Sequence, residues 1–125
     1  MILRNGVDLI EIERFESAYK RHGERLLTRV FTPSEIEDTG RRIESLAVRF
    51  AAKEAVSKAL GTGIGEVSWK EIEILKGQDL EPVLRLHGKA QEVASDVGIE
   101  SWAISLTHTR AFALAFVVAT GPSSK

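Results

Sequence analysis

The sequence predicts an α+β domain in which a mostly antiparallel sheet packs on one long, buried helix. Two observations support this fold class. Residues 46–60 are rich in alanine, and apolar side chains occupy almost the whole circumference of the helix they would form. Short apolar runs bounded by glycine and polar turns lie on both sides of this segment, as is typical of strands. The 125 residues suit a single domain, which we expect over 1–120, followed by a tail over 121–125.

In chain order, we expect a first strand over 2–7 and then a helix that begins at Asp8. Asp8 is a good capping residue, and with Glu11 it loosely fits a capping box. The run from Thr32 to Glu35 fits that box better and has proline at the first helical position, so it predicts another helix start. The long helix follows, and Gly61 is placed to end it in a left-handed conformation.

The second half of the chain predicts four strands and a helix. The nearly apolar last strand is expected to be central in the sheet and covered on both faces. Residues 105–110 would connect the two closing strands. The strands are expected around 69–74, 83–86, 102–106 and 111–119, and the helix over 88–97.

Composition excludes several classes of function. Lys plus Arg is 17 and Asp plus Glu is 18, a net charge of −1, which gives no global argument for nucleic acid or an anionic membrane as partner. The absence of cysteine excludes a disulfide scaffold and thiol catalysis. Because no stretch is long and apolar enough to span a membrane, we expect a soluble, cytoplasmic protein.

Two charged residues on the long helix call for an explanation, since the rest of its surface is apolar. Glu54 and Lys58 share one stripe with the small residues Ala47 and Ala51, which leave room for a ligand or another backbone. The alternative is a simple ion pair worth about 0.2–0.5 kcal/mol. Asp8 likewise is either a helix cap or, beside Glu54, a ligand for Mg²⁺, which commonly binds one or two carboxylates plus phosphate and water.

Two loops carry groups that could contact phosphate. The glycine turn over 61–65 follows a helix, so it is not a P-loop, but its N–H groups could form a small anion nest. Residues 105–110 combine hydroxyls, an imidazole and a guanidinium, which suit phosphate better than a Ser/His hydrolase. A connector and an ordinary polar hairpin are the alternatives.

Residues 6–15, 49–61 and 105–108 together resemble the holo-acyl-carrier-protein synthase family, the small bacterial 4′-phosphopantetheinyl transferases. The order and separation of these motifs also match, and the resemblance covers about 1–120. It implies transfer of the 4′-phosphopantetheine arm of coenzyme A to a serine of apo-acyl carrier protein. Adenosine 3′,5′-bisphosphate would be released, Mg²⁺ would be required, and fatty-acid biosynthesis would be served.

The resemblance also assigns roles to residues. It makes Asp8 and Glu54 the Mg²⁺ ligands and Lys58 a catalytic lysine beside the pyrophosphate, and it leaves Glu54 or a metal-bound water as the general base. All three count as catalytic residues. The coenzyme A contacts that we expect are Arg49, Lys58, Gly61, Gly63, Ser105 and His108.

Partner surfaces follow from the same resemblance. Arg14 matches a basic position that meets the acidic carrier protein, and the spacing of Arg21 and Arg25 would place them on the same helix face. A solvated face is the alternative. The family forms homotrimers with sites at the subunit interfaces, so we expect the same here, with 111–119 and the alanine-rich helix supplying contact area.

Three other functions are consistent with parts of this pattern. They are a trimer that binds coenzyme A or carrier protein without turnover, a structural oligomer, and a coenzyme A hydrolase. The joint presence of Asp8, Glu54 and Lys58 favours the transferase.

Overall fold

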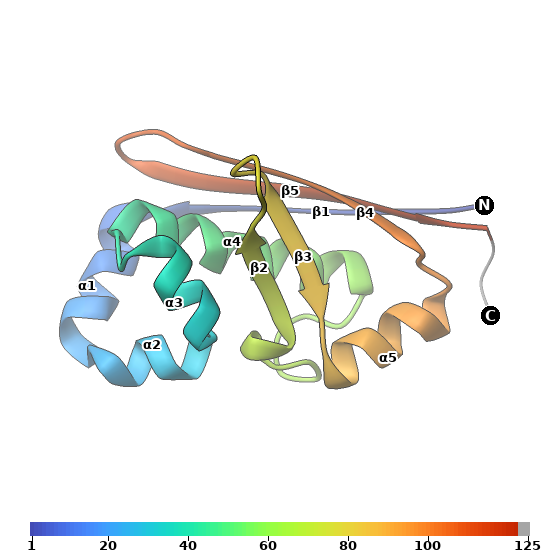
Figure 1. Ribbon diagram of the computed structural model, residues 1–125, viewed down its shortest axis with the longest axis horizontal. Helices are drawn as coiled ribbons and strands as arrows, with labels where there is room; N and C mark the ends of the chain where they lie inside the picture. The colour runs from blue at the N-terminus through green and yellow to red at the C-terminus, as the bar shows by residue number, and fades with distance from the viewer. Residues whose placement is uncertain (123–125) are drawn as a thin grey trace.

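The computed structural model describes residues 1–122, and they form an α+β domain with two antiparallel sheets. The larger sheet has three strands in the order β1-β5-β4, and the long helix α4 runs along one of its faces (Figure 1). The strands are β1 (Ile2–Glu11), β4 (Ser101–His108) and β5 (Phe112–Gly121), and the helix is α4 (Ile43–Leu60).

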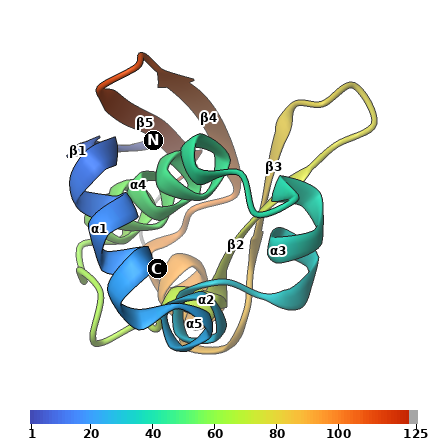
Figure 2. The same ribbon diagram turned by 90° about the vertical axis from the view of Figure 1, so that its left-hand side faces the viewer.

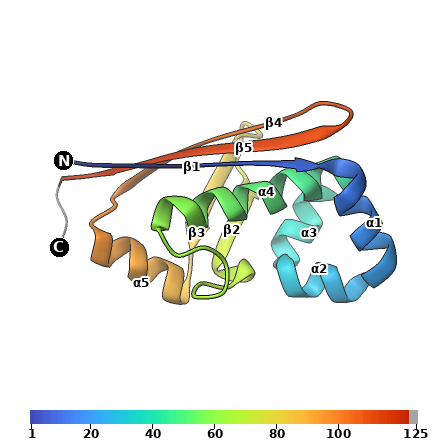
Figure 3. The same ribbon diagram turned by 180° about the vertical axis from the view of Figure 1, so that it is seen from behind.

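The remaining elements surround α4. Three short helices gather at its N-terminal end and α5 lies at its other end (Figure 3), while the β2–β3 hairpin stands to one side (Figure 2). The short helices are α1 (Ile12–His22), α2 (Glu24–Val30) and α3 (Pro33–Thr39). The others are the 3-10 helix η1 (Trp69–Glu71), β2 (Ile72–Lys76), β3 (Pro82–Leu86) and α5 (Gly88–Val97).

Helix α4 is the centre of the molecule, as the sequence predicts. Two hydrophobic clusters meet along it, one shared with the large sheet, β2 and α5, and the other with α1 and α2. Gly61 ends the helix with φ 85°, in the left-handed conformation that glycine adopts most readily. The predicted capping box is also present at α3, where Thr32 and Glu35 exchange hydrogen bonds.

The start of the chain differs from the expectation. Asp8 caps no helix, because β1 continues to Glu11 and α1 begins at Ile12. All ten residues of β1 pair with β5, and Asp8 lies opposite Ala115. Hydrogen bonding to the partner strand therefore overrides the local helical pattern, and the residue alternation of a strand decides which way Asp8 points.

The closing strands are longer than predicted. Strand β4 reaches His108, so Ser105 to His108 belong to a strand and the turn itself is confined to 109–111. Strand β5 reaches Gly121, which pairs with Ile2 and is buried, so the expected tail begins at least one residue later. Residues 123–125 of that tail lie outside the described part of the chain.

Strand β5 is central, as predicted, but only one of its faces is covered in this chain. Its inward residues Ala113, Ala115, Val117 and Ala119 are fully buried against α4. The opposite face carries exposed apolar side chains, and among residues 1–122 no helix lies over it (Figures 1 and 3). These side chains are Leu3, Val7, Leu9, Phe112 and Phe116, with exposed fractions of 41–64%.

Candidate functional site

The site forms where β1 crosses the second half of α4, and a glycine makes the crossing close. A Cβ on Gly6 would lie 1.9 Å from the carbonyl oxygen of Ala55, so no larger residue fits without moving the strand or the helix. Arg4 secures the same crossing, because its side chain donates hydrogen bonds to the carbonyls of Ala59 and Leu60 at the end of α4. Ala55 therefore admits another backbone, one and two helical turns beyond Ala51 and Ala47, the positions at which room was expected.

Asp8 lies two residues beyond Gly6 and faces α4. The Nζ of Lys58 is 3.1 Å from Oδ1 of Asp8 and donates a second hydrogen bond, of 2.9 Å, to the carbonyl of Val7. The Asp8 side chain is 17% exposed and that of Lys58 is 51% exposed, so the pair borders solvent. Lys58 therefore forms its ion pair with Asp8 of β1. It does not form the pair with Glu54 that their spacing of four residues along α4 allows.

Glu54 precedes Lys58 by one turn of α4 and lies close enough to Asp8 and Lys58 for their charges to act on its carboxyl. Partial burial raises the pKa of the Glu54 carboxyl above its ordinary value, and the negative charge of Asp8 raises it further, while Lys58 acts in the opposite direction. A carboxyl with a raised pKa beside a second carboxylate and an ammonium is an arrangement found at catalytic sites.

These two carboxylates fit a hard divalent cation that has other ligands as well. Across residues 1–122 there is no group of three or more His, Cys, Asp or Glu side chains that could hold a metal by protein ligands alone. Asp8 and Glu54 supply two partly exposed carboxylates, which suits Mg²⁺ because it keeps several waters and often binds substrate phosphates.

Lys53 is a charged residue that the sequence reasoning passed over. Its side chain and that of Glu35 are fully buried, and its Nζ donates to Oε1 of Glu35 at 2.8 Å. The carbonyls of Trp69 and Ile72 accept two further hydrogen bonds from it. Burial lowers the pKa of Lys53, but the three acceptors stabilise the charged ammonium. The sequence could have indicated this buried pair, because Lys53 lies in a helix that is apolar on almost all sides.

Arg49 does not join Asp8, Glu54 and Lys58. It lies about 140° around the helix from Glu54, and its side chain is buried. Its guanidinium donates to the carbonyl of Ile74 at 3.1 Å and to that of Ser45 at 3.3 Å. In this structure Arg49 therefore ties α4 to β2.

The glycine turn after α4 offers few free N–H groups. The amides of Gly61, Thr62 and Gly63 all donate to the carbonyl of Ser57, and that of Gly65 donates to Val67. An anion nest needs unpaired N–H groups, so the connector is the better description of this turn. Gly61 and Gly63 both have positive φ angles, which explains the glycines without a ligand.

Ser105 and His108 lie apart from one another on β4. Ser105 is exposed on the outer face of the sheet, opposite Phe116. His108 is at the end of β4. It lines a hollow of about 540 Å³ between the β4–β5 turn and the first turns of α1 and α4. Arg110 and Thr109 line it too, together with the carboxylates Glu16 and Glu44.

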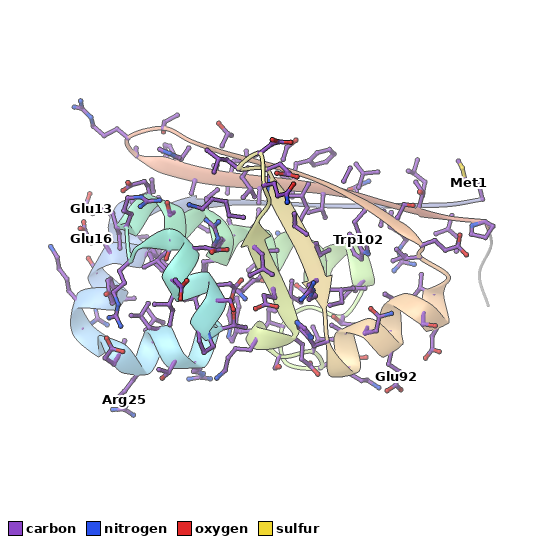
Figure 4. The ribbon with its side chains drawn as sticks, viewed as in Figure 1. Met1, Glu13, Glu16, Arg25, Glu92 and Trp102 are labelled. Carbon is purple, nitrogen blue, oxygen red and sulfur yellow. The ribbon has the colours of Figure 1, made fainter. Side chains whose placement is uncertain are left out.

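The three arginines proposed for docking are exposed but do not share one helix. Gly23, with φ 55°, separates α1 from α2, so Arg14 and Arg21 lie on α1 and Arg25 on α2. Arg25 projects away from the sheet (Figure 4). Arg14 lines a mainly apolar hollow of about 490 Å³, and Arg25 lines a second hollow, which includes His22 and Arg29; both hollows include Leu26.

Among the described residues, none of the helices has both the length and the apolar character that crossing a membrane requires.

The sequence and the fold are both similar to those of known proteins. Residues 4–117 match the sequence profile of the family described as the 4′-phosphopantetheinyl transferase superfamily. The holo-acyl-carrier-protein synthase of Herpetosiphon aurantiacus is 46% identical over 127 residues, which cover 96% of this chain and all of that protein.

Two solved structures have the same fold. The Helicobacter pylori holo-acyl-carrier-protein synthase in complex with coenzyme A has a TM-score of 0.85 and 37% identity, covering 93% of this chain and 99% of that one. The Bacillus anthracis synthase in complex with coenzyme A (3′,5′-ADP) has a TM-score of 0.76 and 33% identity, covering 98% and 96%. The chain therefore belongs to the 4′-phosphopantetheinyl transferase superfamily.

Proposed function

We propose that this protein transfers the 4′-phosphopantetheine group of coenzyme A to a serine of apo-acyl carrier protein, with Mg²⁺ as cofactor. The observation that carries the proposal is the meeting of Asp8 from β1 with Glu54 and Lys58 from α4. The names of the relatives and the coenzyme A in two similar structures support the same reaction. The family membership places it among phosphopantetheinyl transferases.

The chemistry of the reaction fits these three side chains. Transfer of a phosphoryl group depends mainly on positioning and on stabilisation of negative charge. Asp8 and Glu54 would hold the Mg²⁺, which supplies charge neutralisation to the pyrophosphate when it is bound. The Lys58 ammonium, half exposed beside them, would neutralise or protonate the leaving phosphate oxygen. Glu54 is this chain's own candidate for the base that accepts the serine proton.

Intact-mass spectrometry tests this function directly. Apo-acyl carrier protein is incubated with coenzyme A, Mg²⁺ and the protein, with and without chelator. We expect a Mg²⁺-dependent gain of one phosphopantetheine group, lost in Glu54→Gln and kept in Glu92→Gln, a matched change at an exposed glutamate on α5. A folded protein that binds coenzyme A but modifies none of several carrier proteins would contradict the proposal and favour a binding protein.

The coenzyme A contacts remain a proposal that rests on the resemblance for most residues. Lys58 has support from its position beside the two carboxylates. His108 shares its hollow with Arg110 and Thr109, a guanidinium and a hydroxyl that suit a phosphate, and also with the carboxylates Glu16 and Glu44, which do not. Arg49, Gly61, Gly63 and Ser105 are retained on the resemblance alone.

A homotrimer with sites at the subunit interfaces fits the open face of the sheet. The exposed apolar side chains there are of the kind that a soluble monomer rarely presents as a group. Ser105 lies on that face, in register with Phe116 and Val7, so a second copy would bring its own residues to one of the proposed coenzyme A contacts. Sedimentation equilibrium should give three copies for the wild type and fewer for Phe116→Glu.

Docking of the acidic carrier protein is proposed at Arg14, Arg21 and Arg25. All three are exposed, and the apolar hollow beside Arg14 could receive an apolar side chain of the partner. Because charge attraction between exposed groups is screened by salt, the KM for carrier protein should rise with ionic strength. A KM independent of salt would contradict this surface.

We expect the reaction to serve fatty-acid biosynthesis in the cytoplasm, in keeping with the absence of cysteine.

A further inference from the structure

The ammonium of Lys58 lies against Oδ1 of Asp8, one of the two carboxylate oxygens of a proposed metal ligand. Nζ of Lys58 is 3.1 Å from Oδ1 of Asp8, and its second hydrogen bond, to the carbonyl of Val7, keeps it against β1. The two carboxylates therefore already have a positive charge beside them.

The backbone around this contact has little freedom to change. Gly6 touches the carbonyl of Ala55, and Arg4 binds the carbonyls at the end of α4, so β1 and α4 are held together on the N-terminal side of Asp8. The Lys58 side chain, by contrast, is 51% exposed and flexible along its four methylene groups. The Lys58 side chain is therefore the part of this contact that can most readily move to admit another cation.

The charges favour such an exchange. Lys58 contributes one positive charge against the two carboxylates Asp8 and Glu54, which repel each other. A divalent cation would balance both. The cation and the ammonium repel each other, so they would not share Oδ1 of Asp8 at close range.

We propose that Lys58 is the resident cation of the Asp8–Glu54 pair in the metal-free protein, and that a divalent cation displaces its ammonium from Asp8. The proposal rests on the metal site of the proposed function. It adds an order of events: Lys58 becomes free to contact phosphate oxygens when the metal has entered. Lys58 thus competes with the metal for Asp8. Once displaced, it would help the metal to neutralise the negative charge of the phosphate.

Binding of Mn²⁺ alone, without coenzyme A or carrier protein, tests the competition. Free Mn²⁺ is measured by electron paramagnetic resonance during titration of the wild type, Lys58→Met and Lys89→Met. Methionine matches the length and helix propensity of lysine, and Lys89 is an exposed lysine on α5 that pairs with Glu92, so it controls for general loss of a positive charge. We expect Lys58→Met to bind Mn²⁺ at least threefold more tightly than the wild type, and Lys89→Met to match the wild type.

A Lys58→Met variant that binds Mn²⁺ no more tightly than the wild type overturns the proposal. The same titration with Glu54→Gln separates this failure from failure of the metal site. If Glu54→Gln weakens Mn²⁺ binding while Lys58→Met does not strengthen it, the site stands and the competition does not. If Glu54→Gln leaves the affinity for Mn²⁺ unchanged, the proposed metal site itself is wrong.

Thermal unfolding provides a second test that needs no metal affinity. The midpoints of Asp8→Asn, Lys58→Met and the double variant are compared with the wild type in chelator and again in saturating Mn²⁺. We expect non-additive shifts in chelator, because the two side chains interact there, and loss of that non-additivity with Mn²⁺. Additive shifts in chelator would overturn the proposal.

Discussion

Helix α4 carries two lysines five residues apart, and each pairs with a carboxylate from another element. Lys53 and its partner Glu35 are fully buried, whereas Lys58 is half exposed and its partner Asp8 is 17% exposed. The two pairs have nearly the same chemistry, yet only one is accessible to a ligand.

The difference lies in how the donors are used. All three hydrogen bonds of the Lys53 ammonium go to protein acceptors, and Glu35 in turn accepts from the backbone N–H groups of Thr32 and Ile74. That pair links α4 to α3, η1 and β2. Lys58 makes two hydrogen bonds, both to β1, and its exposed side chain can turn toward solvent. A saturated pair holds the fold, and an open pair can exchange its partner.

The largest expected effect is on stability, from breaking the buried pair. Lys53→Met would leave Glu35 as an unpaired buried carboxylate, which typically costs about 3–5 kcal/mol. We expect the free energy of unfolding, measured by urea denaturation, to fall by that amount. Lys58→Met is the matched control, and a loss below about 1 kcal/mol, the upper end for an exposed pair, is expected for it. Equal losses would show that burial does not distinguish the two pairs.

The next effect is on catalysis, from the open pair. Lys58→Met should lower kcat by about 100-fold or more, as removal of one group that stabilises transition-state charge does. The Kd for coenzyme A, measured by calorimetry, should change much less, because the interaction strengthens as the leaving group gains charge. Equal losses in both quantities would assign Lys58 to ground-state binding.

The smallest effect is a dependence on pH that comes from Glu54. Its pKa is raised in the folded protein by burial and by Asp8, so the native state binds this proton more tightly than the unfolded state does. Stability from this group is fully present below the unfolded pKa and is lost as pH rises through the folded pKa. Glu54→Gln removes the unfavourable charge, so its Tm in chelator should exceed that of the wild type at neutral pH.

That difference in Tm should shrink as pH falls through the carboxyl range, and it should be small because Glu54 is only partly buried. A Tm of Glu54→Gln equal to or below that of the wild type at neutral pH would contradict the raised pKa. Together these measurements distinguish the exposed Lys58–Asp8 pair and its neighbour Glu54 from the buried Lys53–Glu35 pair.

Several parts of the fold were predicted because their causes are local. Alanines over the span of α4, glycine at its end and the capping box at Thr32 act within a few residues, so periodicity and capping rules reveal them. The apolar run of β5 likewise predicted a central strand. Hydropathy did not predict that one face of this strand would be exposed in the single chain.

The sequence by itself determined which residue types could serve the site, and the resemblance singled out Asp8, Glu54 and Lys58. Only the tertiary structure decided how they meet. Asp8 became a strand residue through pairing with β5, and Gly6 set the distance of that strand from α4. The same long-range packing buried Lys53 and turned Arg49 toward β2, while it left Lys58 open. The contacts of Lys53 with Glu35, of Arg49 with Ile74 and of Lys58 with Val7 join residues 18–51 positions apart. Over such a separation, local periodicity carries no information about which side chains will meet.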